Sequence, residues 1–278
     1  MMAKSLWRSL RVIEHLTTGA IIALYIRLRS SIGRRPVWVP QAVHWWHARL
    51  CRALGLRLRI VGRVEPGCLL VGNHISWLDI PIVGAQHEIA FLSKSEVRGW
   101  PLIGWMAEIA GTLFIERGAH QADRIAACIV AEVARGHPLM IFPEGTTSEG
   151  HCVRRFHPRL FSVAQDSGIR IQPVAIGYRR GEDPTPDPHA PYVDDDTLIA
   201  NLWQIIRHPD LVAHIQFLPP LRADDDATRR SLAESSRLAI VTALGLDPEN
   251  DRRRGHDRPE TAPASGESTL SSPDPSPA

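Results

Sequence analysis

The sequence predicts an α/β fold, with a mixed, largely parallel sheet flanked by helices and preceded by amphipathic N-terminal helices. Short runs of β-branched and aromatic residues alternate along the chain with segments of helical periodicity. Gly, Pro or charged residues follow these runs, as is typical of strand ends. The chain has 278 residues, of which 44% are hydrophobic, so it can bury the core of one such domain with terminal extensions.

Residues 1–55 predict basic, amphipathic helices that associate with a membrane. The apolar run from Leu16 to Ile26 is only about 11 residues long, whereas roughly 20 are needed to cross a bilayer. We therefore expect an interfacial helix on an anionic membrane surface, placing the protein at the cytoplasmic face of the inner membrane. Glu14 is the one acidic residue among the first 60, whose basic residues are Lys4, Arg8, Arg11, Arg27, Arg29, Arg34, Arg35, Arg49, Arg52, Arg57 and Arg59.

A second helix is expected over residues 41–54. Val43, Trp46, Leu50 and Leu54 lie along one stripe, with Trp45 beside it. The indole rings suit the head-group region of a membrane, whereas a core helix packed on the sheet explains the same stripe. Both interpretations hold together if one face packs on the sheet and its edge meets lipid.

A strand, a turn and a helix start are expected between residues 68 and 79. The apolar run 68–71 precedes Asn73 and His74, and Asp79 follows five residues after the histidine. Residues five apart in a regular helix lie about 140° apart around its axis. The two side chains can therefore meet only if His74 lies in the turn, with Ser76 near the N-cap and Asp79 in the first helical turn.

A histidine and a carboxylate arranged in this way can abstract a proton. Histidine titrates near neutral pH, and a neighbouring carboxylate fixes its tautomer and stabilises the imidazolium that forms. A histidine near a helix start also serves as a structural hydrogen-bonding group, so this pair alone does not decide the function.

Three further motifs follow in order, each attached to a strand-like run. They are residues 111–118 (GTLFIERG), 141–148 (IFPEGTTS) and 171–176 (IQPVAI). In open α/β sheets, ligands bind at the carboxyl ends of strands. Helices are expected at 123–135, 159–165, 198–206 and 227–244, with a loop at 181–191 and a strand at 214–218. The domain is expected to span residues 56–246, and the tail 247–278 is expected to be disordered because it lacks apolar content.

Together the four motifs resemble the glycerolipid acyltransferase family, the group that includes 1-acylglycerol-3-phosphate acyltransferases. The resemblance covers roughly residues 40–220 and implies that His74 is the general base and that Asp79 orients it. It also implies a set of residues that hold the acceptor, namely Arg117, Glu144, Gly145, Thr146 and Lys94. The alternatives are that Arg117 only pairs with a nearby glutamate and that Lys94 is a solvated loop residue.

The implied reaction moves a fatty acyl group from acyl-CoA or acyl carrier protein to the free hydroxyl of a lysophospholipid, 1-acylglycerol-3-phosphate first among them. A thioester is already activated, so neither a covalent enzyme intermediate nor a cofactor is expected. Backbone N–H groups of the 73–77 turn or of the Gly145-Thr146 turn are expected to stabilise the carbonyl oxygen. No histidine or cysteine spacing typical of a metal site occurs, and neither a metal nor a nucleic-acid partner is expected.

Position 147 leaves the acceptor open. Many of the lysophosphatidate acyltransferases that this chain resembles carry an arginine at the position of Thr147. Either Arg154, Arg155 or Arg159 takes its place, or the acceptor is another lyso-lipid, such as lyso-ornithine lipid. Two alternatives come from other functional classes, a thioesterase or lipase that uses water, and a membrane-binding module without activity.

Overall fold

In the computed structural model, which describes residues 2–115, 122–193, 196–221 and 227–247, seven strands form one sheet in the order β1-β7-β6-β2-β5-β3-β4. Neighbouring strands are parallel except β6 and β7, which are antiparallel, so the expected mixed, largely parallel sheet is confirmed. The strands are β1 (Arg57–Val61), β2 (Cys68–Gly72), β3 (Ala90–Lys94), β4 (Leu113–Ile115), β5 (Leu139–Ile141), β6 (Arg170–Arg180) and β7 (Leu211–Phe217).

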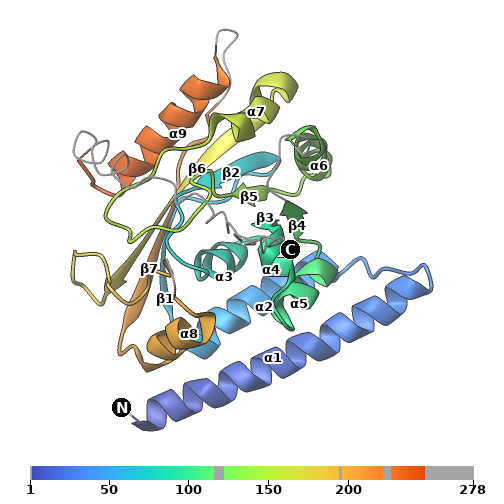
Figure 1. Cartoon of the computed structure of the whole chain (residues 1–278), viewed down its shortest axis with the longest axis vertical. Helices are drawn as coiled ribbons and strands as arrows, with labels where there is room; N and C mark the ends of the chain where they lie inside the picture. The colour runs from blue at the N-terminus through green and yellow to red at the C-terminus, as the bar shows by residue number, and fades with distance from the viewer. Residues whose placement is uncertain (1, 116–121, 194–195, 222–226, 248–278) are drawn as a thin grey trace, which may run out of the picture.

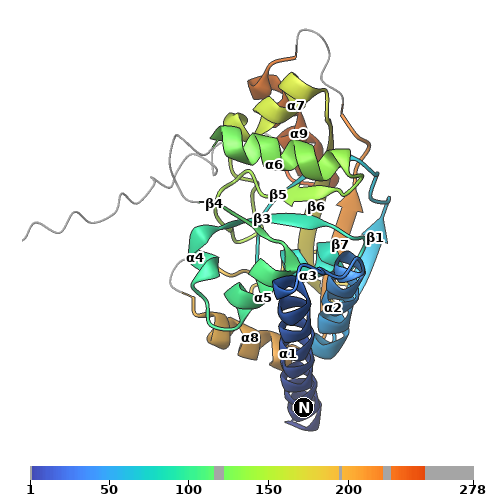
Figure 2. The same ribbon diagram turned by 90° about the vertical axis from the view of Figure 1, so that its right-hand side faces the viewer.

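Helices cover both faces of the sheet (Figures 1 and 2). Leu69 and Leu70 are adjacent in β2 and point to opposite faces, and each belongs to a different buried apolar cluster. The cluster of Leu70 includes residues of α1, α2, α3 and α8, and the cluster of Leu69 includes residues of α6, α7 and α9. The helices are α1 (Met2–Ser31), α2 (Val39–Leu54), α3 (Asp79–Gly84), α4 (Ser95–Arg98), α5 (Ile103–Ala110), α6 (Ala122–Ala134), the 3-10 helix η2 (Pro158–Phe161), α7 (Ser162–Ser167), α8 (Leu198–Arg207) and α9 (Arg229–Ala243).

The first helix is much longer than its apolar run. α1 continues through the charged residues on both sides of residues 16–26, and its length and composition are sufficient to cross a membrane. The helix is therefore longer than the apolar run alone predicts, and its interfacial position stays a prediction. One face is buried through Val12, Gly19, Ala23 and Ile26, which recur every three to seven residues. A Cβ at Gly19 would lie 2.5 Å from the indole nitrogen of Trp46, so glycine allows the close approach of α1 to α2.

The second helix packs on the body of the protein and leaves one edge exposed. Leu50 and Leu54 are buried in the apolar cluster that covers one sheet face. Trp45 is 42% exposed beside them. The packed face of the expected stripe is thus confirmed, and its exposed edge carries an indole.

Several elements differ from expectation. The helix expected at 159–165 is η2 followed by α7, and Lys94, for which a loop position was one alternative, is the last residue of β3. β1 was not expected; its sequence, Arg-Leu-Arg-Ile-Val, carries two arginines, and the strand is mostly exposed at the sheet edge. Arg57 and Arg59 of this strand form ion pairs with Asp210 and Glu182.

Candidate active site

The histidine and the aspartate of the first motif meet in the turn between β2 and α3. His74 follows the end of β2, and Asp79 is the first residue of α3. His74 Nδ1 lies 2.7 Å from Asp79 Oδ2, so the expected strand, turn and helix start are confirmed. Ser76 is not the N-cap, which is Leu78, and the Ser76 hydroxyl has no hydrogen-bond partner among the described residues.

The Asp79 carboxylate is fully buried and accepts four hydrogen bonds. Oδ2 accepts from His74 Nδ1 and from the backbone N–H groups of Ile75, at 2.8 Å, and Ser76, at 3.0 Å. Oδ1 accepts from the Tyr178 hydroxyl at 2.7 Å. These donors stabilise the carboxylate and close the turn, which is why no Ser76 cap is needed. Burial and then the Asp79 charge raise the pKa of Tyr178 well above its ordinary value, so its hydroxyl stays a donor.

The bond to Asp79 places the imidazole proton on Nδ1 and leaves Nε2 of His74 as an acceptor. The His74 side chain is 21% exposed, so a substrate hydroxyl can reach it. The Phe142 ring stacks against the imidazole, with centroids 4.1 Å apart and an interplanar angle of 14°. The ring is therefore fixed, while its Nε2 has no partner within the described ranges, as a general base requires.

The motif after β5 holds the backbone of His74. Glu144 is buried; Oε1 accepts from the N–H of His74 at 2.9 Å, and Oε2 accepts from the N–H of Arg154 at 3.2 Å. The Ser148 N–H donates to the His74 carbonyl at 2.8 Å. Burial raises the pKa of Glu144 to about 8, although the two N–H groups and the Arg154 charge lower it. Both carboxyl oxygens thus serve the protein backbone, and contact of Glu144 with the acceptor stays a prediction.

The other expected acceptor-binding residues lie around this centre or outside the description. Gly145 and Thr146 are exposed, and Gly145 has a φ of +71°, which favours glycine. A Cβ at Gly145 would lie 3.3 Å from His157 Nε2, which places that ring beside the turn. Lys94 is the last residue of β3, and Arg117 lies outside the described residues.

The candidate donors to a developing oxyanion are fewer than expected. The two carboxylates described above already take the N–H groups of residues 74–76, and the Gly145 N–H donates to the carbonyl of Phe142. The N–H groups of Trp77 and Thr146 have no acceptor in the described part of the chain. The Trp77 and Thr146 N–H groups are therefore available, one from each turn.

Sequence reasoning missed the part that β6 plays in this site. The Asn73 side chain exchanges two hydrogen bonds of 2.8 Å with the backbone of Ile176, which fastens the end of β2 to β6. Tyr178 lies two residues further along β6, on the same face as Ile176. The sequence did contain a signal for Tyr178. The 171–176 motif is a strand in which every second residue points to the same face, and Tyr178 is the next such residue after Ile176.

The loop between β6 and α8 buttresses both turns. The Tyr192 N–H donates to the Ile75 carbonyl at 3.0 Å, and the Thr147 hydroxyl donates to the Tyr192 carbonyl. Asn201 of α8 accepts a hydrogen bond of 2.8 Å from the indole of Trp77. Thr147, at the position where many similar enzymes carry an arginine, is therefore hydrogen-bonded to the backbone of this loop.

Comparisons with known proteins agree with this geometry. A family model described as Acyltransferase matches residues 57–177. The lyso-ornithine lipid O-acyltransferase of Pseudomonas aeruginosa is 41% identical over 86% of this chain and 93% of that protein. The 1-acyl-sn-glycerol-3-phosphate acyltransferase of Neisseria meningitidis is 32% identical over 67% of this chain and 74% of that protein.

A solved structure shares the fold. The 1-acyl-sn-glycerophosphate acyltransferase of Thermotoga maritima superposes with a TM-score of 0.62 and 16% identity, covering 88% of this chain and 94% of that one. The shared fold thus accompanies a sequence relationship to other acyltransferases that spans most of the chain. This protein belongs to the acyltransferase family and is an O-acyltransferase.

Proposed function

We propose that this enzyme acylates the hydroxyl of lyso-ornithine lipid. The relative with the higher identity and coverage carries that acceptor in its name, whereas the glycerophosphate enzyme matches less of the chain. The comparisons thus support the alternative acceptor better than 1-acylglycerol-3-phosphate, the first expectation. Thr147 agrees with this choice, because a short neutral side chain bonded to the Tyr192 carbonyl supplies no charge for a terminal phosphate.

The observation that carries acyl transfer is the His74–Asp79 pair with its free Nε2. His74 Nε2 takes the proton of the acceptor hydroxyl while the oxygen attacks the thioester carbonyl. The new C–O bond forms, the C–S bond breaks, and the imidazolium returns the proton to the leaving thiolate. Asp79 stabilises the imidazolium, and general base catalysis of this kind contributes about 10²- to 10⁴-fold.

Two backbone groups complete the proposed chemistry. The N–H groups of Trp77 and Thr146 are available to the carbonyl oxygen as it gains negative charge. The acyl donor is the thioester of coenzyme A or of acyl carrier protein, which acts as a co-substrate, and no further cofactor is required. Arg117, Lys94 and the exposed Gly145 are proposed to contact the acceptor.

The membrane surface is proposed to meet the outward face of α1. Leu10, Ile13, Ile21 and Leu24 of this face are each at least half exposed. The opposite face packs on α2, α5 and α8, so a peripheral position is favoured over a membrane crossing by α1. Basic residues of the first two helices favour an anionic surface, which we assign to the cytoplasmic face of the inner membrane.

Two pairs of substitutions test this orientation. Ile21→Glu with Leu24→Glu should reduce binding to anionic vesicles, because it places charge in the apolar face. Ile60→Glu with Val61→Glu, at exposed positions of the β1 edge, is the matched control and should leave vesicle binding unchanged. Equal binding by both double variants would show that α1 does not face lipid.

The acceptor is tested by direct competition. The purified protein is incubated with lyso-ornithine lipid and 1-acylglycerol-3-phosphate, with each thioester donor, and the products are identified by mass spectrometry. We expect ornithine lipid as the main product and none with His74→Ala. Preferential formation of phosphatidic acid would reverse the acceptor assignment, and free fatty acid without any esterified product would identify a thioesterase.

A further inference from the structure

A second concave site lies away from His74. Its volume is about 300 Å³, and its lining comes from the end of β6, the loop that follows and the end of α8. The lining side chains include Arg180, His189, Trp203, Arg207 and His208. Within the described part of the chain, none of them bonds to His74 or Asp79, so the cavity is distinct from the catalytic turn.

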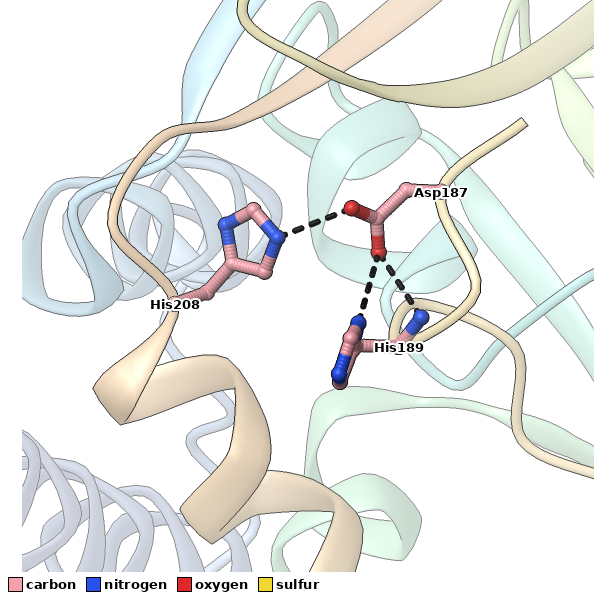
Figure 3. Close-up of side chains that lie close together, drawn as sticks. All are labelled: Asp187, His189 and His208. Carbon is pink, nitrogen blue, oxygen red and sulfur yellow. Dashed lines mark hydrogen bonds and ion pairs between the residues drawn. The ribbon is translucent and has the colours of Figure 1, made fainter. Parts of the chain in front are cut away.

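A carboxylate and two imidazoles beside this cavity resemble a metal site, but Asp187 and His208 are already hydrogen-bonded to each other and to the backbone. Figure 3 shows Asp187 between the rings of His189 and His208. Asp187 Oδ1 accepts from the N–H groups of His189 and Ala190, and Oδ2 lies 2.8 Å from His208 Nε2. His208 Nδ1 accepts from the Asp210 N–H at 3.2 Å, so the proton is on Nε2 and points to Asp187. A cation would have to displace this network.

The walls of the cavity carry positive charge. Arg180 and Arg207 are exposed and form no ion pair with any described residue, and the Arg207 guanidinium stacks on the Trp203 ring. The exposed carboxylate of Asp183 interacts electrostatically with Arg180 and accepts two hydrogen bonds from Thr185. The two guanidinium groups offer hydrogen-bond donors to an anion and no ligand atom to a cation. A guanidinium binds phosphate through two parallel hydrogen bonds.

The surroundings of the cavity are apolar and adjoin α1. On α8, Ile199 is 80% exposed and Trp203 is 48% exposed. Arg8 of α1 donates to the carbonyls of Ile206 and His208, so the N-terminal part of α1 lies against the cavity wall. The neighbours of Arg8 on α1 include Leu6 and Trp7, which are exposed as well. A ligand bound here would place an anionic group at the two arginines and an apolar part beside the exposed apolar residues of α1 and α8.

We propose that this cavity binds the phosphate of an anionic phospholipid head group, with Arg180 and Arg207 as its ligands. The inference goes beyond the acyl transfer proposed above, because it assigns a lipid site that does not contact the base. Bound lipid would fix the angle between α8 and the membrane, and α8 holds the catalytic turn through Asn201 and Trp77.

Binding of a soluble phospholipid to the full-length protein tests the proposal. The probes are dihexanoylphosphatidylglycerol and inorganic phosphate, each titrated by calorimetry. The variant Arg180→Gln with Arg207→Gln should weaken binding of the lipid on the order of tenfold or more. The control variant, Arg229→Gln with Arg230→Gln, removes the same charge from α9, at the other end of the molecule from α1, and should bind as the parent does (Figure 1).

Each outcome decides the matter. A loss of lipid affinity confined to the Arg180 and Arg207 variant, with an unchanged melting temperature, supports the site. Equal affinities for both double variants, or no binding to any of the proteins, overturns it. Inorganic phosphate bound as tightly as the lipid would show a general phosphate site and would overturn the assignment to a lipid. None of these results depends on which acceptor is acylated.

Discussion

Within the described part of the chain, two histidine–aspartate pairs have contact distances below 3 Å but different consequences. His74 bonds to Asp79 at 2.7 Å through Nδ1, and its Nε2 is left free on a side chain that is 21% exposed. His208 bonds to Asp187 at 2.8 Å through Nε2 (Figure 3), its Nδ1 accepts a backbone N–H, and its side chain is 2% exposed. The carboxylate is buried in both pairs.

The comparison shows that a close carboxylate does not make a base. In the pair of His208, both ring nitrogens have partners, so the imidazole can only join the end of α8 to the loop before it. In the pair of His74, the carboxylate takes one nitrogen, and the other has no partner among the described residues. The accessible nitrogen of His74 distinguishes the two pairs. This distinction can be tested by making the same substitution in each pair and comparing the effects.

The largest difference is expected from removing each histidine. His74→Ala should lower kcat by about 10²- to 10⁴-fold with little change in melting temperature, because it deletes the base at a partly exposed position. His208→Ala should leave kcat within a few fold and cost about 3 kcal/mol of stability, because it leaves the Asp187 carboxylate buried without its partner. Initial rates and thermal unfolding of both variants measure this, and similar loss of activity in both would erase the distinction.

Replacing each aspartate by asparagine should give a smaller but parallel contrast. Asp79→Asn removes the charge that stabilises the imidazolium and sets an amide against the N–H groups of Ile75 and Ser76. We expect kcat to fall about 10²-fold or more, with KM nearly unchanged. Asp187→Asn should affect unfolding far more than kcat. A KM effect without a kcat effect at position 79 would contradict the orienting role.

Tyr178→Phe should produce a moderate effect on the first pair alone. The change leaves Asp79 Oδ1 buried without its donor, which costs about 1 to 3 kcal/mol. Asp79 keeps three of its four donors, so kcat should fall only about tenfold. The pH profile of kcat provides the second measurement, because an altered carboxylate environment shifts the apparent pKa of the base. Loss of stability with an unchanged rate and pH profile would make Tyr178 purely structural.

Much of the first pair could be predicted from sequence, because its geometry is local. The spacing from His74 to Asp79 and the apolar run before it determine a strand, a turn and a helix start. The contacts that complete the site are long-range. Tyr178 reaches Asp79 from 99 residues away, and Asn201 reaches Trp77 from 124 residues away. No local periodicity encodes such distances, which depend on the order of strands in the sheet.

The second pair was invisible in the sequence for the same reason. Asp187 and His208 are separated by the whole of α8, and neither belongs to a recognisable motif. α1 shows a different limit, since its apolar run was judged alone while the helix extends through charged residues that pack on the body or face solvent. Local pattern predicts where elements lie, and packing decides how far they extend.

The smallest effect on activity concerns Glu144, which supports the first pair and has no counterpart at the second. Burial raises its pKa to about 8 from an ordinary value of 4.5, so the folded state binds more protons than the unfolded state between these limits. Stability contributed by this group is therefore lost as pH rises through the window, with a slope of up to about 1.4 kcal/mol per pH unit. The glutamine of the variant Glu144→Gln does not ionise, so the variant lacks this contribution to the pH dependence of stability.

Urea unfolding of the parent and of Glu144→Gln at several pH values between 5 and 8 measures the difference in slope. All other titrating groups are common to the two proteins, so a flatter profile in the variant isolates Glu144. The glutamine carbonyl can still accept the His74 N–H, and kcat should stay within about tenfold of the parent. Parallel stability profiles would mean that Glu144 is ionised in the folded protein, and its two backbone donors would then outweigh its burial.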